Sequence, residues 1–184
     1  VALAYGHAAD VAVLAAWRKD AEIFNETYCR HLQRFGRATE ETPWFAGQII
    51  MVTRNDYMQD LFNGDIGLIM PDTASANGLA AYFPDMEGFR KTAVSRLPAH
   101  EPAFAMTVHK SQGSEYRVWL VPPSVASAYD EDSLSGLNNA LLYTGITRAR
   151  KRFVFFGSKQ EMTAAVETVR IRRTALYDMV NSLF

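Results

Sequence analysis

The first and last parts of the chain alternate between predicted strands and predicted helices. Residues 11–17 form a short apolar run that suits a buried strand, and residues 20–35 carry apolar side chains at a helical period. After residue 100 we predict strands at 104–108, 118–121 and 152–156 and helices at 136–149 and 159–180. Strands that alternate with helices indicate a parallel sheet covered on both faces.

Residues 44–99 have a different rhythm, in which short predicted strands are separated by turn signals. Asn63-Gly64 is a strong tight-turn signal, and further reversals are marked by Pro71-Asp72, Asn77-Gly78 and Pro84-Asp85. Four or five small strands in a segment of this length predict a compact β-barrel. We therefore expect one α/β domain, formed by residues 1–43 and 100–184, that carries an inserted barrel at 44–99.

Composition narrows the class of protein. A chain of 184 residues with 48% hydrophobic residues can build the core of one ordinary domain with a small insertion. The formal net charge of -1 excludes nucleic-acid binding by bulk charge, so any such contact must be local. No apolar run approaches the roughly 18 residues of a membrane span, and we expect a cytoplasmic protein without a membrane partner.

Cysteine and histidine usage argues against a disulfide or a metal centre. The single cysteine, Cys29, lacks an internal partner, and its place in a helical pattern favours packing over nucleophilic chemistry. The four histidines have no spacing typical of a metal site. No GxxxxGK[ST] sequence occurs, so we expect this chain by itself not to hydrolyse ATP. The absence of an initial methionine suggests a piece of a longer protein.

The candidate chemistry lies between Ala103 and Phe156. A predicted strand runs into a polar turn, His109 to Gly113, which offers donors without bulk and suits a phosphate or a nucleic-acid backbone. Gly113 lets backbone donors approach an anion, and the carboxylate of Glu115 suits a ribose hydroxyl. The alternative is an ordinary solvated loop.

Arg148 is an unusual charge because it shares the apolar stripe of its predicted helix. It follows Leu141 by seven residues, which places the two side chains almost on one face. Two interpretations remain open. The arginine can cap the end of the helix, where the macrodipole favours a cation. It can also present a planar, permanently charged fork to the γ-phosphate of a nucleotide.

Three segments together resemble the C-terminal part of superfamily 1B DNA helicases of the RecD type, the alpha chains of exodeoxyribonuclease V. They are AMTVHKSQGSEY, LLYTGITRARKRFVFFG and RNDYMQDLFNGDIG. VLAAWRKDAEIFNETYCRHLQ resembles helicase motif IV, residues 105–116 resemble motif V, and residues 143–150 resemble motif VI. The resemblance implies an α/β fold in which a RecA-like parallel sheet, domain 2A, carries an inserted SH3-like β-barrel, domain 2B.

The resemblance also implies roles for single residues. The γ-phosphate of ATP would be contacted by Arg148 and Arg18, the nucleotide would be bordered by Gly113 and Glu115, and the single strand would touch Thr107, His109 and Lys110. ATP and Mg2+ would be used by the full-length protein, with the Mg2+ ligands and Walker motifs on a first RecA-like domain that this chain lacks.

As a whole, the resemblance implies part of an ATP-dependent 5′-3′ DNA helicase that acts in double-strand break repair and recombination. Its expected partners are single-stranded DNA, the missing N-terminal RecA-like domain, and the helicase-nuclease and scaffold subunits of exodeoxyribonuclease V. Two alternatives stay open: a non-catalytic nucleic-acid or protein-binding module, and a stand-alone RecD-like or conjugative relaxase-helicase.

Overall fold

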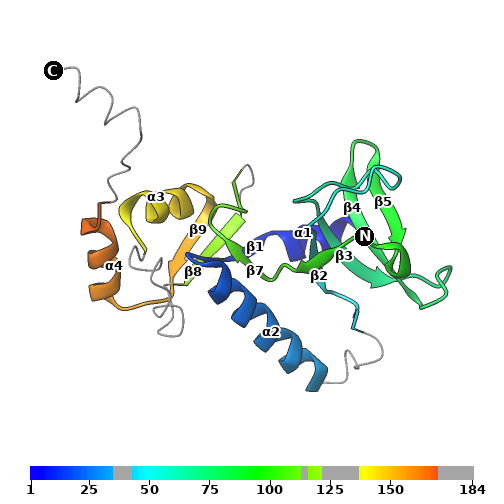
Figure 1. Ribbon diagram of the computed structural model, residues 1–184, viewed down its shortest axis with the longest axis horizontal. Coiled ribbons are helices and arrows are strands. Elements are labelled where there is room, and N and C mark those ends of the chain that lie inside the picture. The colour runs from blue at the N-terminus through cyan, green and yellow to red at the C-terminus, as the bar shows by residue number, and fades with distance from the viewer. Residues whose placement is uncertain (35–42, 113–115, 122–136, 170–184) are drawn as a thin grey trace, which may run out of the picture.

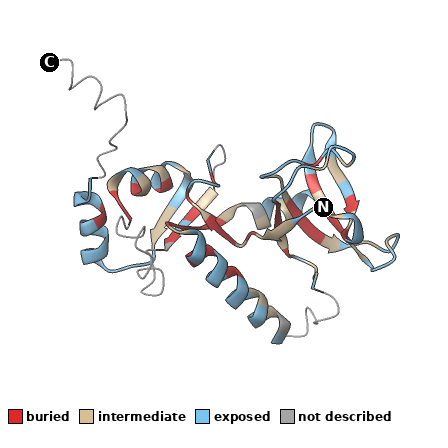
Figure 2. Cartoon of the chain, in the orientation of Figure 1, coloured by how far each residue is buried: buried red, intermediate tan, exposed pale blue. Residues whose placement is uncertain are grey.

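The computed structural model describes residues 1–34, 43–112, 116–121 and 137–169. Within them a parallel sheet with its helices and an antiparallel sheet lie next to each other, and the long helix α2 (Arg18–Arg34) extends from the first toward the second (Figure 1). Buried residues concentrate on the strands of both sheets (Figure 2).

Four strands form a parallel sheet, which confirms the α/β fold class predicted from the alternation of strands and helices. In spatial order they are β7 (Ala105–Thr107), β1 (Val11–Ala15), β8 (Tyr116–Val121) and β9 (Ala149–Phe155). Val13 of β1 lies opposite Ala105 on one side and Trp119 on the other. Because all four strands run the same way, their carboxyl ends share one edge of the sheet and their amino ends share the other.

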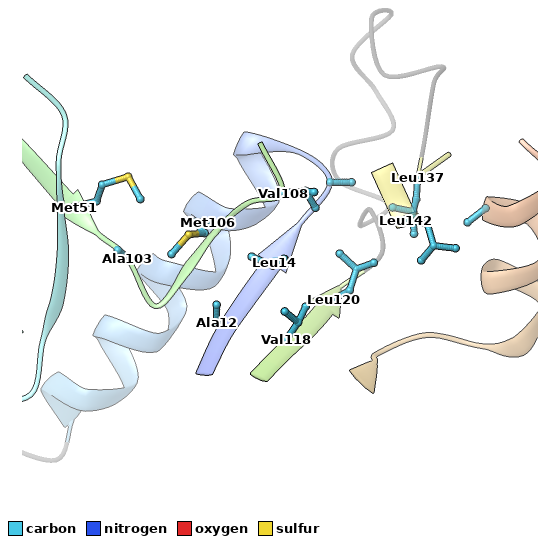
Figure 3. Packing of buried hydrophobic residues seen from close by; sticks show 12 residues of the cluster. Ala12, Leu14, Met51, Ala103, Met106, Val108, Val118, Leu120, Leu137 and Leu142 are labelled. Carbon is cyan, nitrogen blue, oxygen red and sulfur yellow. The ribbon is translucent and has the colours of Figure 1, made fainter. Parts of the chain in front are cut away.

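Helices cover the two faces of β1. Val13 and Ala15 pack with Ala21 of α2 on one face. On the other face Leu14 belongs to a larger cluster with Leu142 of α3 (Asn139–Thr147) (Figure 3). The alternation along β1 follows from the period of two in a strand.

Side-chain caps fix where the C-terminal helices begin. The Asn138 side chain accepts a hydrogen bond from Leu141 N at the start of α3. Ser158 and Glu161 form a reciprocal capping box at the start of α4 (Lys159–Glu167).

The predicted helix at 159–180 is too long at its described end. The helix stops at Glu167 because Thr168 takes an extended conformation and is followed by a second β-branched residue, Val169. The rest of that predicted helix lies outside the described residues. Helix α1 (Ala2–Ala9) was not predicted, because its residues show no helical alternation and include Gly6.

The antiparallel sheet confirms the short strands predicted in the middle of the chain. Its order is β5 (Gly88–Ala93), β4 (Leu79–Asp85), β3 (Ile66–Pro71), β2 (Ile49–Val52) and β6 (His100–Pro102). A 3-10 turn, η1 (Val94–Arg96), precedes β6. Gly64 in the predicted Asn63-Gly64 turn has a φ of 100°, a value that glycine adopts without strain. Strand β6 lies just past residue 99, yet it pairs with β2.

Within the described part of the chain, no helix is both long and apolar enough to cross a bilayer.

Candidate functional site

The predicted site residues divide between the two ends of the parallel sheet. Thr107 ends β7, with His109 and Lys110 just beyond it, and Arg18 follows the end of β1. Arg148 lies at the opposite end, since it directly precedes β9 and its carbonyl accepts a hydrogen bond from the first residue of β8, Tyr116 (2.8 Å). We call these the carboxyl edge and the amino edge of the sheet.

At the carboxyl edge, β7 continues into a tight turn held by its own hydrogen bonds. The hydroxyl of Thr107 accepts from Lys110 N (3.3 Å), and its carbonyl accepts from Ser111 N (3.2 Å). The fully buried Ser111 hydroxyl donates to Val108 O (2.7 Å). The turn therefore has an anchored base, while the side chains of His109 and Lys110 are exposed.

Arg18 and Lys110, the two predicted site cations at the carboxyl edge, are each paired with a carboxylate of the same chain. Arg18 Nε contacts Glu22 Oε1 at 2.7 Å, and this hydrogen bond raises the pKa of the exposed guanidinium. Lys110 Nζ contacts Glu101 Oε1. All four side chains keep at least 32% of their surface exposed. Such exposed pairs are weak, so an anionic ligand can replace the carboxylates at little cost.

At the amino edge, the backbone N–H of Arg148 is hydrogen-bonded, whereas, within the described part of the chain, the Nε of its side chain is not. The backbone N–H bonds to the carbonyls of Gly145 and Ile146, which ends α3. The Nε atom of Arg148 is buried and has no hydrogen-bond partner among the described residues. An unpaired buried donor is costly, so a ligand that accepts from it gains more than one at an exposed site.

Arg148 faces a cleft of about 600 Å³ between the amino edge, α1 and the antiparallel sheet. Its lining also includes Arg150, Tyr116, Asp10 and Tyr5. Burial, followed by the nearby Tyr116 and Asp65, raises the pKa of Tyr5 to about 12. Its hydroxyl donates to Ile66 O (3.1 Å), which ties α1 to the antiparallel sheet. The cleft is large enough for a nucleotide-sized ligand.

The structure does not bring Arg18 and Arg148 together. The five residues of β1 separate the two edges, which corresponds to roughly 15 Å of strand. Arg18 instead lines a second cavity with Thr107 and Lys110, the residues expected to touch DNA. The predicted positions Gly113 and Glu115 lie outside the described residues.

Asn25 is a buried residue that the sequence interpretation did not single out. Its amide nitrogen donates to Pro102 O (2.8 Å) and Ala105 O (2.9 Å), and its oxygen accepts from Ala105 N (2.8 Å). It thereby attaches α2 to the link between β6 and β7. The signal was available, because Asn25 follows the buried Ala21 by four residues and is a polar residue in the buried stripe of a helix.

No group of three or more His, Cys, Asp or Glu side chains suited to a metal ion occurs within the described ranges.

Comparison with known sequences gives a consistent result. Residues 102–155 match the model of the UvrD-like helicase C-terminal domain. The RecBCD enzyme subunit RecD of Haemophilus influenzae is 37% identical over 145 residues, which are 78% of this chain and 20% of that protein. RecD of Mycolicibacterium smegmatis is 39% identical over 152 residues, or 80% of this chain and 25% of that protein.

The ATP-dependent RecD2 DNA helicase of Deinococcus radiodurans is 31% identical over 138 residues, which are 74% of this chain and 18% of that protein. The chain thus spans a quarter or less of the length of these curated relatives.

Solved structures show the same fold. A structure of Pif1 helicase, from work on DNA unwinding at forked double-stranded DNA, matches with a TM-score of 0.51 and 17% identity. The match covers 94% of this chain and 44% of the Pif1 chain. Pif1 from Bacteroides in complex with ADP-AlF3 and single-stranded DNA has a TM-score of 0.50 and 16% identity, with the same coverage. At this identity the likeness concerns the fold: a helicase-like α/β fold with a parallel sheet.

Proposed function

We propose that this chain, which belongs to the RecD-type helicases and matches their C-terminal part, supplies the arginine-finger half of an ATP site and part of a single-stranded DNA track. The observation that carries the proposal is the position of Arg148, whose buried Nε lacks a partner beside a cleft of about 600 Å³. The rest of the ATP site would lie on another domain of the full-length protein.

At the amino edge, Arg148 would act on the γ-phosphate of ATP. Phosphoryl transfer relies on positioned positive charge more than on covalent chemistry, and a guanidinium matches the phosphate oxygens with a planar fork. The hydrogen bonds that the Arg148 N–H donates to the carbonyls of Gly145 and Ile146 fix the backbone from which this side chain extends. By resemblance, Gly113 and Glu115 would border the nucleotide, and Mg2+ would be held by ligands outside this chain.

At the carboxyl edge, Thr107, His109 and Lys110 would contact the single strand. The anchored turn holds the exposed side chains of His109 and Lys110 next to each other, and Lys110 offers a charge whose present partner, Glu101, is partly exposed. Phosphate contacts of this kind position a strand without reading its sequence. Each would make binding sensitive to salt.

For Arg18, position supports a role on the DNA side. The resemblance pairs it with Arg148 at the γ-phosphate, but its guanidinium shares a cavity with Thr107 and Lys110. We therefore include Arg18 in the proposed DNA track.

The antiparallel sheet would be the SH3-like barrel of domain 2B, inserted at about residues 44–99 into a domain 2A formed by 1–43 and 100–184. Movement of this unit against an N-terminal RecA-like domain would drive 5′-3′ translocation on DNA in break repair and recombination. Relatives named as RecBCD subunits support helicase-nuclease and scaffold proteins as further partners.

The test is ATP turnover by the complete protein after substitution of Arg148. We expect Arg148→Ala to lower turnover by about 10³ or more, the usual contribution of an arginine finger, with folding intact. Arg148→Lys should be almost as damaging, because a point charge does not reproduce the fork. Arg152→Ala, an exposed arginine on the same strand–helix unit, is the matched control. Near-normal turnover of Arg148→Ala would refute the role.

A further inference from the structure

A second cavity, of about 330 Å³, opens at the carboxyl edge between α2 and the link from β6 to β7. Its inner wall is apolar and includes Pro102, Ala105 and Met106. Asn25 fixes this wall, because its amide hydrogen bonds are all made to the backbone of Pro102 and Ala105. Hydrogen bonds within the chain therefore fix the position of this wall.

The mouth of the cavity is lined by charged side chains of both signs. Arg18 and Lys110 supply cations, while Glu22, Glu26 and Glu101 supply carboxylate oxygens. Each carboxylate contacts a cation of the chain through one of its two oxygens, and a carboxylate oxygen can accept a further hydrogen bond. A flat ring could lie against the apolar wall, its amino groups could donate to the carboxylates, and a phosphate attached to it could contact the cations.

We propose that this cavity takes a nucleobase with an exocyclic amino group from the single strand, while Arg18 and Lys110 contact the flanking phosphates. The inference rests on the proposed function, since it assumes that DNA follows the carboxyl edge. A volume near the lower limit of ligand pockets suits one base and not a larger molecule.

The carboxylates give the cavity a preference among bases. A carboxylate accepts a hydrogen bond from the amino group of cytosine, whereas thymine offers a carbonyl and a methyl group at the same place. Thymine would therefore bring its oxygen toward a negative charge. The cavity is expected to hold cytosine in preference to thymine.

Cys29 gives a direct readout, because it is the one cysteine of this chain and lines the cavity. The complete protein is alkylated with iodoacetamide at mildly alkaline pH, since burial raises the pKa of the Cys29 thiol. The modified peptide is quantified by mass spectrometry, which separates Cys29 from cysteines elsewhere in the protein. Oligo-dC, oligo-dT and an abasic oligonucleotide of equal length are compared, each at ten times its own Kd.

We expect oligo-dC to slow the alkylation of Cys29 about tenfold, because only the unbound fraction reacts. The abasic oligonucleotide should change the rate by less than about twofold, since phosphates at the mouth leave the wall open. Equal protection by both would overturn the base pocket, and so would no protection by oligo-dC. Absence of any DNA binding, measured by fluorescence anisotropy, would overturn the pocket together with the DNA track on which it rests.

A substitution that fills part of the cavity provides a second test of the proposal. Cys29 is only partly buried, so Cys29→Leu adds bulk to the cavity without disturbing the main core. We expect it to weaken oligo-dC binding about tenfold, within the usual worth of one stacked base, and to leave the affinity for oligo-dT within about twofold. Unchanged affinity for oligo-dC would contradict the pocket.

Discussion

Replacing Asn25 by alanine should destabilise the protein far more than its position on the outer helix suggests. The substitution removes three hydrogen bonds to the link between β6 and β7. Ala105 is 3% exposed, so its N–H would be left without water or acceptor, at a cost of about 1–3 kcal/mol. The two carbonyl bonds add about 0.5–1.5 kcal/mol each. We expect a loss of about 2–6 kcal/mol in the free energy of unfolding.

Urea denaturation of the wild-type and Asn25→Ala proteins, followed by circular dichroism, measures this difference. Asn77→Ala is the matched control, since Asn77 is exposed in a turn and should change stability by less than about 0.5 kcal/mol. A loss below about 1 kcal/mol for Asn25→Ala would refute the view that Asn25 holds α2 to the link between β6 and β7.

Asn25→Asp refines the test through its pH dependence. The carboxylate would still accept from Ala105 N but would face the carbonyls of Pro102 and Ala105 without a donor. Its pKa in the folded protein should therefore rise above the unfolded value of about 3.9. Stability is then fullest below about pH 4 and is lost as the pH rises through the folded pKa. A pH profile parallel to that of the wild type would contradict this reasoning.

Two further predictions concern the carboxyl edge and the core. Glu101→Gln releases Lys110 from its partner, so binding of single-stranded DNA should tighten and its salt slope should steepen by up to about 1; weaker binding in a salt titration would contradict this. Gly145→Ala should stabilise α3 by about 0.5–1 kcal/mol, because the added methyl group meets only ordinary contacts from 3.7 Å. Gly67→Ala should destabilise the protein, because its methyl group would lie 2.6 Å from the Phe83 ring. Thermal unfolding of the two variants measures the difference, and a Gly67→Ala protein more stable than Gly145→Ala would refute this prediction.

Local sequence patterns predicted the elements of the parallel sheet but not their order. The apolar run at 11–17 and the strand at 104–108 correspond to β1 and β7, because alternation within a strand is a local property. That β1 lies between β7 and β8 depends on pairings between residues about 90 to 110 positions apart, such as Val13 with Ala105. No periodicity encodes such a pairing.

The position of Arg18 shows where resemblance and chain order differ. Resemblance placed Arg18 with Arg148, yet Arg18 follows a strand and Arg148 ends a helix that leads back to the next strand. In a parallel sheet these two places lie at opposite edges, so the order of elements already separates them. The cleft beside Arg148 was beyond sequence reasoning, since it needs α1 and Tyr5, and α1 has no helical alternation.

We propose that the parallel sheet contacts ATP at its amino edge and DNA at its carboxyl edge. The most direct test of this proposal is to measure two quantities on two variants of the complete protein. ATP turnover at saturating single-stranded DNA and the Kd for single-stranded DNA are determined for Arg148→Ala and Lys110→Gln. We expect Arg148→Ala to lose about 10³ in turnover while its Kd stays within about twofold, and Lys110→Gln to bind DNA more weakly, with a salt slope shallower by up to about 1, while its turnover is retained. Loss of both properties in either correctly folded variant would contradict the separation of the two edges.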